Sequence, residues 1–141
     1  MIINEQEIHE ICKRYLISNY TINPDGSIDV DGDVDLSYKN LDKIPIKFDV
    51  VTGMFYCNNN NLISLENCPN EIKSWFNCSS NKLTSLFGIP NSKNVMYYCA
   101  ENPLESLNGF NGHYDIIYCD NKEILVEKHK RSKKLKQIQN I

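Results

Sequence analysis

Cysteine is the residue type whose spacing in this sequence could support chemistry. Four of the six cysteines, Cys57, Cys78, Cys99 and Cys119, follow one another at steps of 21, 21 and 20 residues. Cysteines in a small chain can form disulfides or hold zinc, but zinc sites draw pairs of ligands from positions a few residues apart. No two cysteines have that spacing, so we predict no metal site and no cofactor. The regular step indicates a repeated buried position, where cysteine acts as a small hydrophobic residue.

The acidic segment between residues 23 and 35 is a second chemical candidate. Asn23, Asp25 and Gly26 match the middle of a calcium-binding EF-hand loop. Thr21 stands where the first aspartate of such a loop belongs, and Gly32 stands where its bidentate glutamate belongs. We therefore expect a solvated acidic hairpin here and no calcium site.

Patterns typical of enzymes are missing from the sequence. The histidines at positions 9, 113 and 129 are scattered, no Cys or Ser stands in a recognisable nucleophile motif, and there is no Gly-rich phosphate loop. We predict that the chain is not an enzyme and has no catalytic residues.

A repeat of 21 residues must position these side chains. The step that separates the cysteines also separates Asn60, Asn81 and Asn102, and two columns of leucines beside them. Each copy reads aromatic-x-Cys-x-x-Asn-x-Leu-x-x-Leu, which matches the leucine-rich-repeat pattern. One degenerate copy on each side brings the total to about five, and we expect the outer two to act as caps.

The role of each column follows from a solenoid of parallel strands, in which residues two apart share a face. Aromatic and cysteine side chains then fill the core, and the asparagines form an internal ladder that satisfies backbone groups left open by neighbouring coils. The segments between the strands contain prolines and no helical period, so we expect an irregular convex face. The predicted fold is a mainly β repeat solenoid with its parallel strands on the concave face.

Outward positions of the predicted strands carry an unusual set of side chains. Such positions are usually polar, yet these columns contain the only Trp, two of the three Met and three of the eight Tyr. An exposed apolar patch with a polar rim often marks an interaction site, and Trp and Tyr dominate such sites. We predict a partner-binding concave face formed by Met54, Tyr56, Trp75, Asn77, Met96, Tyr98, Ile116 and Tyr118 and ringed by Asp33, Asp35, Asp115 and Asp120.

The sequence leaves three explanations open for this face. A different protein could bind to it, a second copy of the chain could bind to it, or the N-terminal helix or the C-terminal tail could fold over it. The first explanation is our prediction, and homo-oligomeric assembly through the same face is the alternative.

The N-terminal residues 4–19 have apolar side chains at helical spacing, including Ile8, Cys12 and Leu16, with Asn4 as the N-cap. We predict a helix that covers the first coil, within an N-terminal cap of residues 1–22. The solenoid then spans residues 23–125. Its dipeptide Asp31-Gly32 predicts a hairpin over residues 27–36 that leads into the first coil.

The C-terminal residues 126–141 are basic. From residue 121 onwards, seven Lys or Arg stand against two Glu, a net charge of +5; the whole chain carries −3, so the preceding residues carry −8. We predict either a basic tail or a helix that caps the last coil. Nucleic-acid binding through Lys128 to Lys136 is a weaker alternative.

The unit from Phe76 to Pro90, with its Cys, Asn and Leu columns, resembles the short leucine-rich repeats of tailed bacteriophages and of bacterial type III secreted effectors. The helix followed by Asn23-Pro24-Asp25-Gly26 is similar to the N-terminal cap of the phage versions. The resemblance implies a leucine-rich-repeat fold and protein binding through the concave face. A phage origin would make a host protein the natural partner. The ubiquitin-ligase domain of the effectors has no counterpart after residue 125, so that activity is not expected.

Composition predicts a cytoplasmic protein, in the host cytoplasm if it is phage-encoded. The first 20 residues lack the basic start and apolar run of a signal peptide. No segment approaches the roughly 18 apolar residues of a membrane span, so we expect no membrane association.

Overall fold

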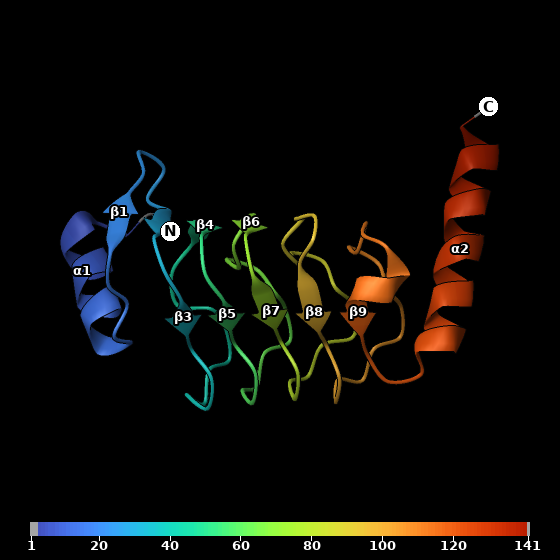
Figure 1. The fold of residues 1–141 in the computed structure, drawn as a ribbon, viewed down its shortest axis with the longest axis horizontal. Coiled ribbons are helices and arrows are strands. Elements are labelled where there is room, and N and C mark those ends of the chain that lie inside the picture. The colour runs from blue at the N-terminus through green and yellow to red at the C-terminus, as the bar shows by residue number, and fades with distance from the viewer. Residues whose placement is uncertain (1–2, 141) are drawn as a thin grey trace.

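A computed structural model describes residues 3–140 of the chain. The polypeptide coils around one long axis, with a helix at each end of the row of coils (Figure 1). The helical elements are α1 (Glu5–Arg14), the 3-10 turn η1 (Tyr114–Ile116) and α2 (Lys122–Gln139). The strands are β1 (Tyr20–Ile22), β2 (Ile28–Val30), β3 (Val34–Asp35), β4 (Phe48–Val51), β5 (Phe55–Tyr56), β6 (Glu71–Ile72), β7 (Trp75–Asn77), β8 (Met96–Tyr98) and β9 (Ile117–Tyr118).

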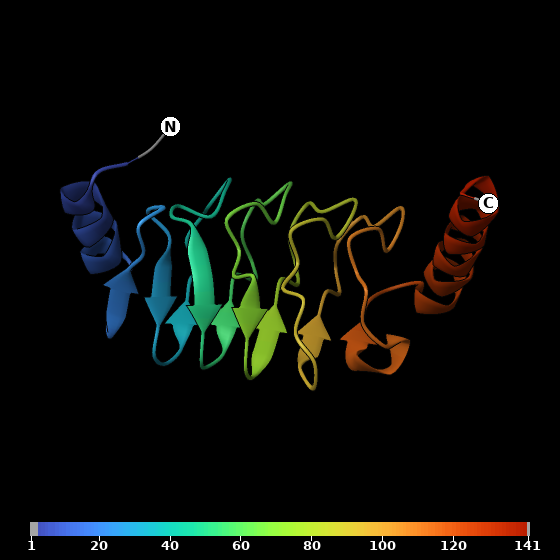
Figure 2. The same cartoon turned by 90° about the horizontal axis from the view of Figure 1, so that it is seen from above.

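The sheet β3-β5-β7-β8-β9 confirms the repeat period that the sequence predicts. Its strands are parallel, and they place Val34 beside Phe55, Phe55 beside Phe76, Phe76 beside Tyr97, and Tyr97 beside Ile117. All of these paired side chains are buried, because alternate residues of a strand face the same side. The five strands belong to a solenoid of about four turns, one fewer than the number of predicted copies. Figure 2 shows these turns from above.

A second sheet, β1-β2-β4-β6, lies on the wall that we predicted to be irregular. Strands β2, β4 and β6 are parallel, and Val51 pairs with Val30 on one side and Ile72 on the other. The prediction of irregular return segments is therefore wrong for these coils. A strand signal is present in β4, where Phe48 and Val51 are buried on either side of partly exposed residues. In the next coil, the corresponding residues 91–94 form no strand.

The predicted asparagine ladder joins neighbouring coils. The Oδ1 of Asn81 accepts the N–H of Leu62 at 2.9 Å, and its Nδ2 donates to the carbonyl of Cys57 at 3.0 Å. Asn60 and Asn102 make the equivalent bonds in their own coils. Each amide thus satisfies backbone groups that the strands leave unpaired.

The periodic cysteines point inward, as predicted. Cys57, Cys78 and Cys99 are fully buried, and Cys119 is partly buried in the last coil. All four are free thiols, although the Sγ atoms of Cys78 and Cys99 are 3.4 Å apart. The column fills the core next to the stacked rings of Phe55 and Phe76, whose centroids are 5.8 Å apart.

The N-terminal helix is shorter than predicted. Asn4 is the N-cap, and it forms a capping box with Glu7. The helix then ends at Arg14 instead of residue 19, because Leu16 adopts a left-handed backbone (φ 56°) and the N–H of Ile17 reaches back to the carbonyl of Cys12. Leu16 is consequently 87% exposed, which corrects its assignment to the buried stripe.

The hairpin lies earlier in the chain than predicted. Strands β1 and β2 are antiparallel, with Tyr20 beside Val30 and Ile22 beside Ile28. The turn between them is closed by Asn23, whose N–H bonds to the carbonyl of Ser27 at 2.8 Å. The prediction of a hairpin over residues 27–36 is therefore wrong, because the Asp31-Gly32 dipeptide forms the corner between the two sheets instead.

The basic C-terminal segment is helical. Helix α2 begins at Lys122, four residues before the predicted boundary, and buries Leu125 and His129 against the last coil. The remaining turns of the helix are mostly exposed. Within residues 3–140, neither long helix has the length and apolar composition that crossing a membrane requires.

Candidate functional site

The outward face of the five-stranded sheet presents the side chains that the sequence predicts. In β7, Phe76 is fully buried, whereas its neighbour Trp75 is 47% exposed. In β9, Ile117 is buried and Tyr118 is 43% exposed. The alternation of each strand therefore sends one set of residues into the core and leaves the other on the surface.

Three aromatic rings on this face touch one another across adjacent coils. Trp75 meets Tyr98 edge to face, with ring centroids 6.0 Å apart. Tyr98 in turn stacks on Tyr118 at 5.3 Å, with the rings only 13° from parallel. We call these three residues the aromatic row. Contacts of this kind restrain the rings, while much of Trp75 and Tyr118 stays exposed to solvent.

Two methionines and Tyr56 complete the apolar part of the face. The hydroxyl of Tyr56 lies 2.8 Å from the sulfur of Met54, and Met96 pairs with Trp75 in the sheet. These three residues are half-buried. Ile116 is also half-buried, but it lies in η1 and not in a strand.

Two carboxylates lie at the N-terminal end of the face. Partial burial raises the pKa of the Tyr56 phenol, and the negative charges of Asp33 and Asp35 raise it further. Both aspartates are exposed. Asp35 also accepts the N–H of Ser37 at 3.0 Å, and Asn77 uses its Oδ1 in the same way two coils later, on Ser79. The Oδ1 of Asn77 is thus already used as an acceptor in the turn that follows β7.

A cation lies at the other end of the face. The Nζ of Lys122, in the first turn of α2, is 5.6 Å from the ring centroid of Tyr118. The exposed carboxylates of Asp115 and Asp120 are at this end too, and Asp120 accepts the N–H of Glu101 at 2.7 Å. The aromatic row therefore already accepts one ammonium group within the chain.

The two helices lie at opposite ends of the coils and do not cover the face. Figures 1 and 2 show α1 beside the first coil and α2 beside the last, in two views at right angles. Together with the exposure of Trp75 and Tyr118, this arrangement rules out intramolecular cover by these helices as the reason for the apolar side chains.

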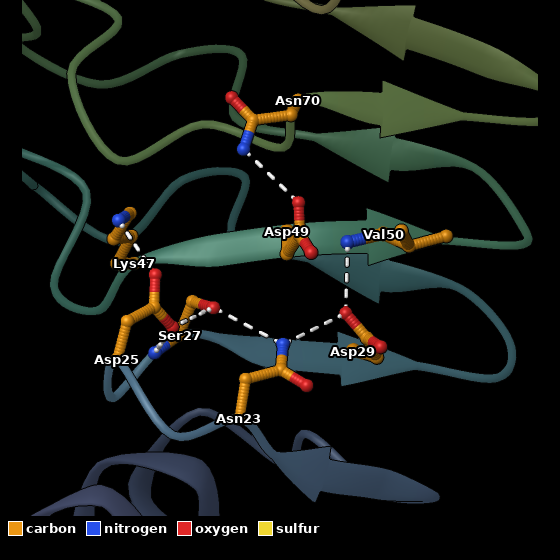
Figure 3. Close-up of polar contacts among 8 residues, drawn as sticks. All are labelled: Asn23, Asp25, Ser27, Asp29, Lys47, Asp49, Val50 and Asn70. Atoms are coloured by element: carbon orange, nitrogen blue, oxygen red, sulfur yellow. Dashed lines mark hydrogen bonds and ion pairs between the residues drawn. The ribbon is translucent and has the colours of Figure 1, made fainter.

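The acidic segment joins coils through hydrogen bonds (Figure 3). Asp25 accepts two bonds from Ser27 and forms an ion pair with Lys47 at 2.9 Å, and these contacts hold its pKa well below the usual range. Asp29 accepts bonds from Asn23 and from the N–H of Val50. Further along the same wall, Asp49 accepts a bond from Asn70. These carboxylates thus hold the turn together and join neighbouring coils. In the part of the chain that the structure describes, no cluster of three His, Cys, Asp or Glu could hold a metal ion.

Comparison with models of protein families, with curated proteins and with solved structures finds no match to this chain. The face presents partly exposed apolar side chains, with exposed carboxylates at both ends.

Proposed function

We propose that the chain is a non-enzymatic protein-binding module that uses the outward face of the five-stranded sheet. The observation that supports this most strongly is the aromatic row, in which Trp75 and Tyr118 are nearly half exposed although both rings pack against Tyr98. Burying aromatic surface is favourable by roughly 25 cal/mol per Å². A partner that covers the row would gain this free energy without having to order the rings first.

The charges around the face favour a partner with basic side chains at its edges. Asp33, Asp35, Asp115 and Asp120 are exposed around the apolar centre. Lys122 over the ring of Tyr118 supports the same preference, since it is an ammonium–aromatic contact on this surface. The resemblance to phage and effector repeats adds support for a protein ligand, and a phage origin would make that ligand a host protein in the host cytoplasm.

Self-association is the second candidate function. The basic helix α2 and the acidic remainder of the chain, at +5 and −8, could attract each other between two copies. Sedimentation over a range of concentrations separates the two functions. A dimer that dissociates in the Trp75→Asp variant would favour self-association, and a monomer at all concentrations would exclude it.

The proposed function is tested by affinity capture from the native cell with three baits. The wild-type chain should retain a partner that the Trp75→Ala/Tyr98→Ala variant loses. Ile63→Ala is the matched control, because Ile63 is 73% exposed but lies outside the face. Retention of the same proteins by all three baits would contradict the proposal, provided that the circular dichroism spectra of the three are equal.

A further inference from the structure

A basic groove lies where α2 meets the last coils, away from the aromatic row. It encloses about 360 Å³ and is lined by Phe87, Gly88, Asn108, Gly109, Asn111, His129, Ser132, Lys133 and Lys136. None of these residues is acidic, although the chain as a whole contains 18 Asp and Glu against 15 Lys and Arg. Ammonium, imidazole, hydroxyl and amide groups can all donate hydrogen bonds, so the groove is a concentration of donors and positive charge.

His129 anchors one wall of the groove. It is only 6% exposed, and its Nδ1 lies 3.0 Å from the hydroxyl of Tyr114. When Tyr114 donates to Nδ1, the proton of the neutral ring lies on Nε2, which then offers an N–H donor. Among the described residues, every fully buried side-chain nitrogen or oxygen has a hydrogen-bond partner. Nε2 makes no hydrogen bond with a described residue, so it is not fully buried and keeps some contact with solvent.

Two ammonium groups lie close to this imidazole. Lys133 and Lys136 follow His129 by four and seven residues in α2, a spacing that places them on the same side of the helix, and both line the groove with it. Burial lowers the pKa of His129, and the positive charges of the two lysines lower it further. Neither lysine forms an ion pair with a residue that the structure describes. An anion between these groups would offset their mutual repulsion.

We propose that this groove binds a phosphate group. Phosphate carries up to two negative charges and accepts several hydrogen bonds at once, which matches Lys133, Lys136, the Ser132 hydroxyl and the Nε2 of His129. Phe87, at the rim of the groove, is 65% exposed and offers a ring on which a base could stack. The phosphate can therefore be free or carried by a nucleoside. This site does not depend on the proposed protein-binding function.

The test is a titration of the full chain at constant ionic strength with inorganic phosphate, adenosine 5′-monophosphate and adenosine, observed through the NMR signals of the His129 ring. Both phosphates should shift these signals saturably and raise the pKa of His129. The K133Q/K136Q variant should weaken binding by roughly tenfold or more, because two charge-assisted hydrogen bonds are lost. The K128Q/K134Q variant removes the same charge from α2 outside the groove and should stay within about twofold of the wild type.

The controls decide between the outcomes. Equal weakening by the two double variants, no response of His129, or adenosine binding as tightly as its monophosphate would each overturn the phosphate site. A further result would overturn the phosphate site: phosphate has no effect on the His129 signals, and a single-stranded oligonucleotide binds both double variants equally. That result would indicate diffuse contact along α2 instead. Tighter binding of the monophosphate than of inorganic phosphate, lost in Phe87→Ala, would support a nucleotide; equal binding would support free phosphate.

Discussion

The ring of Trp75 meets the ring of Tyr98 edge to face, with centroids 6.0 Å apart, across the boundary between two coils. The two residues are 23 positions apart in the sequence, and the parallel register of β7 and β8 brings them together. Tyr98 continues the contact to Tyr118. A binding surface spread over several coils therefore persists only while the stack keeps those coils aligned. The proposed function thus depends on the stability of the fold.

The first prediction concerns the asparagine ladder. Asn81→Ala should lower the free energy of unfolding by roughly 1–3 kcal/mol, because it leaves the N–H of Leu62 without a partner in the core. It also removes one of the two hydrogen bonds to the carbonyl of Cys57, which keeps its bond from Asn60. Urea denaturation measures the change. Asn61→Ala is the matched control, since the side chain of Asn61 bonds only to the exposed side chain of Asn40 in the preceding coil. An equal loss in both variants would show that the ladder has no special role.

The second prediction concerns glycine. Gly26 and Gly109 both have a positive φ, of 84° and 99°. An added Cβ would meet nothing within 4 Å at Gly26, but would lie 2.4 Å from the backbone of Leu86 at Gly109. Gly26→Ala should therefore cost only the left-handed strain of about 1–2 kcal/mol, and Gly109→Ala should cost clearly more. Thermal unfolding of the two variants gives the comparison, and a smaller loss for Gly109→Ala would contradict the coil spacing.

The third prediction concerns pH. The pKa of His129 is lowered below its ordinary value of 6.5 by burial, Lys133 and Lys136. As the pH falls below 6.5, the unfolded chain therefore binds the proton before the folded chain does. The stabilisation that neutral His129 gives to the docked helix α2 should be complete above pH 6.5. It should be lost as the pH falls through the lowered pKa of His129.

Amide hydrogen exchange of α2 between about pH 7.5 and pH 5 measures this loss, after correction for the intrinsic pH dependence of exchange. The exposed His113 serves as the control, because His113→Gln should leave the profile of α2 unchanged. If the His129→Gln variant kept the pH profile of α2 that the wild type shows, another group would control the docking.

The fourth prediction concerns the thiols. Burial raises the pKa of Cys57, and a hydrogen bond with Cys78 together with burial raises that of Cys99. Thiolate formation is therefore disfavoured in the core, whereas Cys119 is only partly buried. A thiol reagent at about pH 8 should label Cys119 first and the other periodic cysteines only at the rate of unfolding. Rapid labelling of Cys57 in the folded protein would contradict the inward column.

The stack of coils could be predicted because the 21-residue period of residue types recurs from coil to coil. Trp75 is placed by strand alternation. Asn81 is placed by the fixed step, which also repeats the left-handed backbone of the residue before each ladder asparagine, as at Ser80 (φ 55°). The predicted hairpin differs from the observed one because Asp31-Gly32 has the composition of a tight turn but lies where the chain passes from one sheet to the other. The sequence carries no signal for β1, because Tyr20–Ile22 is too short to show a period of its own.

The basic groove could not be predicted from the sequence. Its walls come from residues 87–111 and 129–136. They meet because Leu125 and His129 dock α2 on the last coil, with Tyr114 bonded to His129. No repeated position of the sequence corresponds to the contact between Tyr114 and His129. The spacing of the three histidines gives no sign that His129 is buried between α2 and the last coil.

The central claim is that a partner covers the aromatic row. Because Trp75 is the only tryptophan, the chain labelled with 5-fluorotryptophan gives a single ¹⁹F signal, and an unlabelled partner adds none. Titration with the captured protein should shift or broaden this signal saturably, with the same midpoint as the binding isotherm. Full binding that leaves the ¹⁹F signal of Trp75 unchanged would contradict the claim.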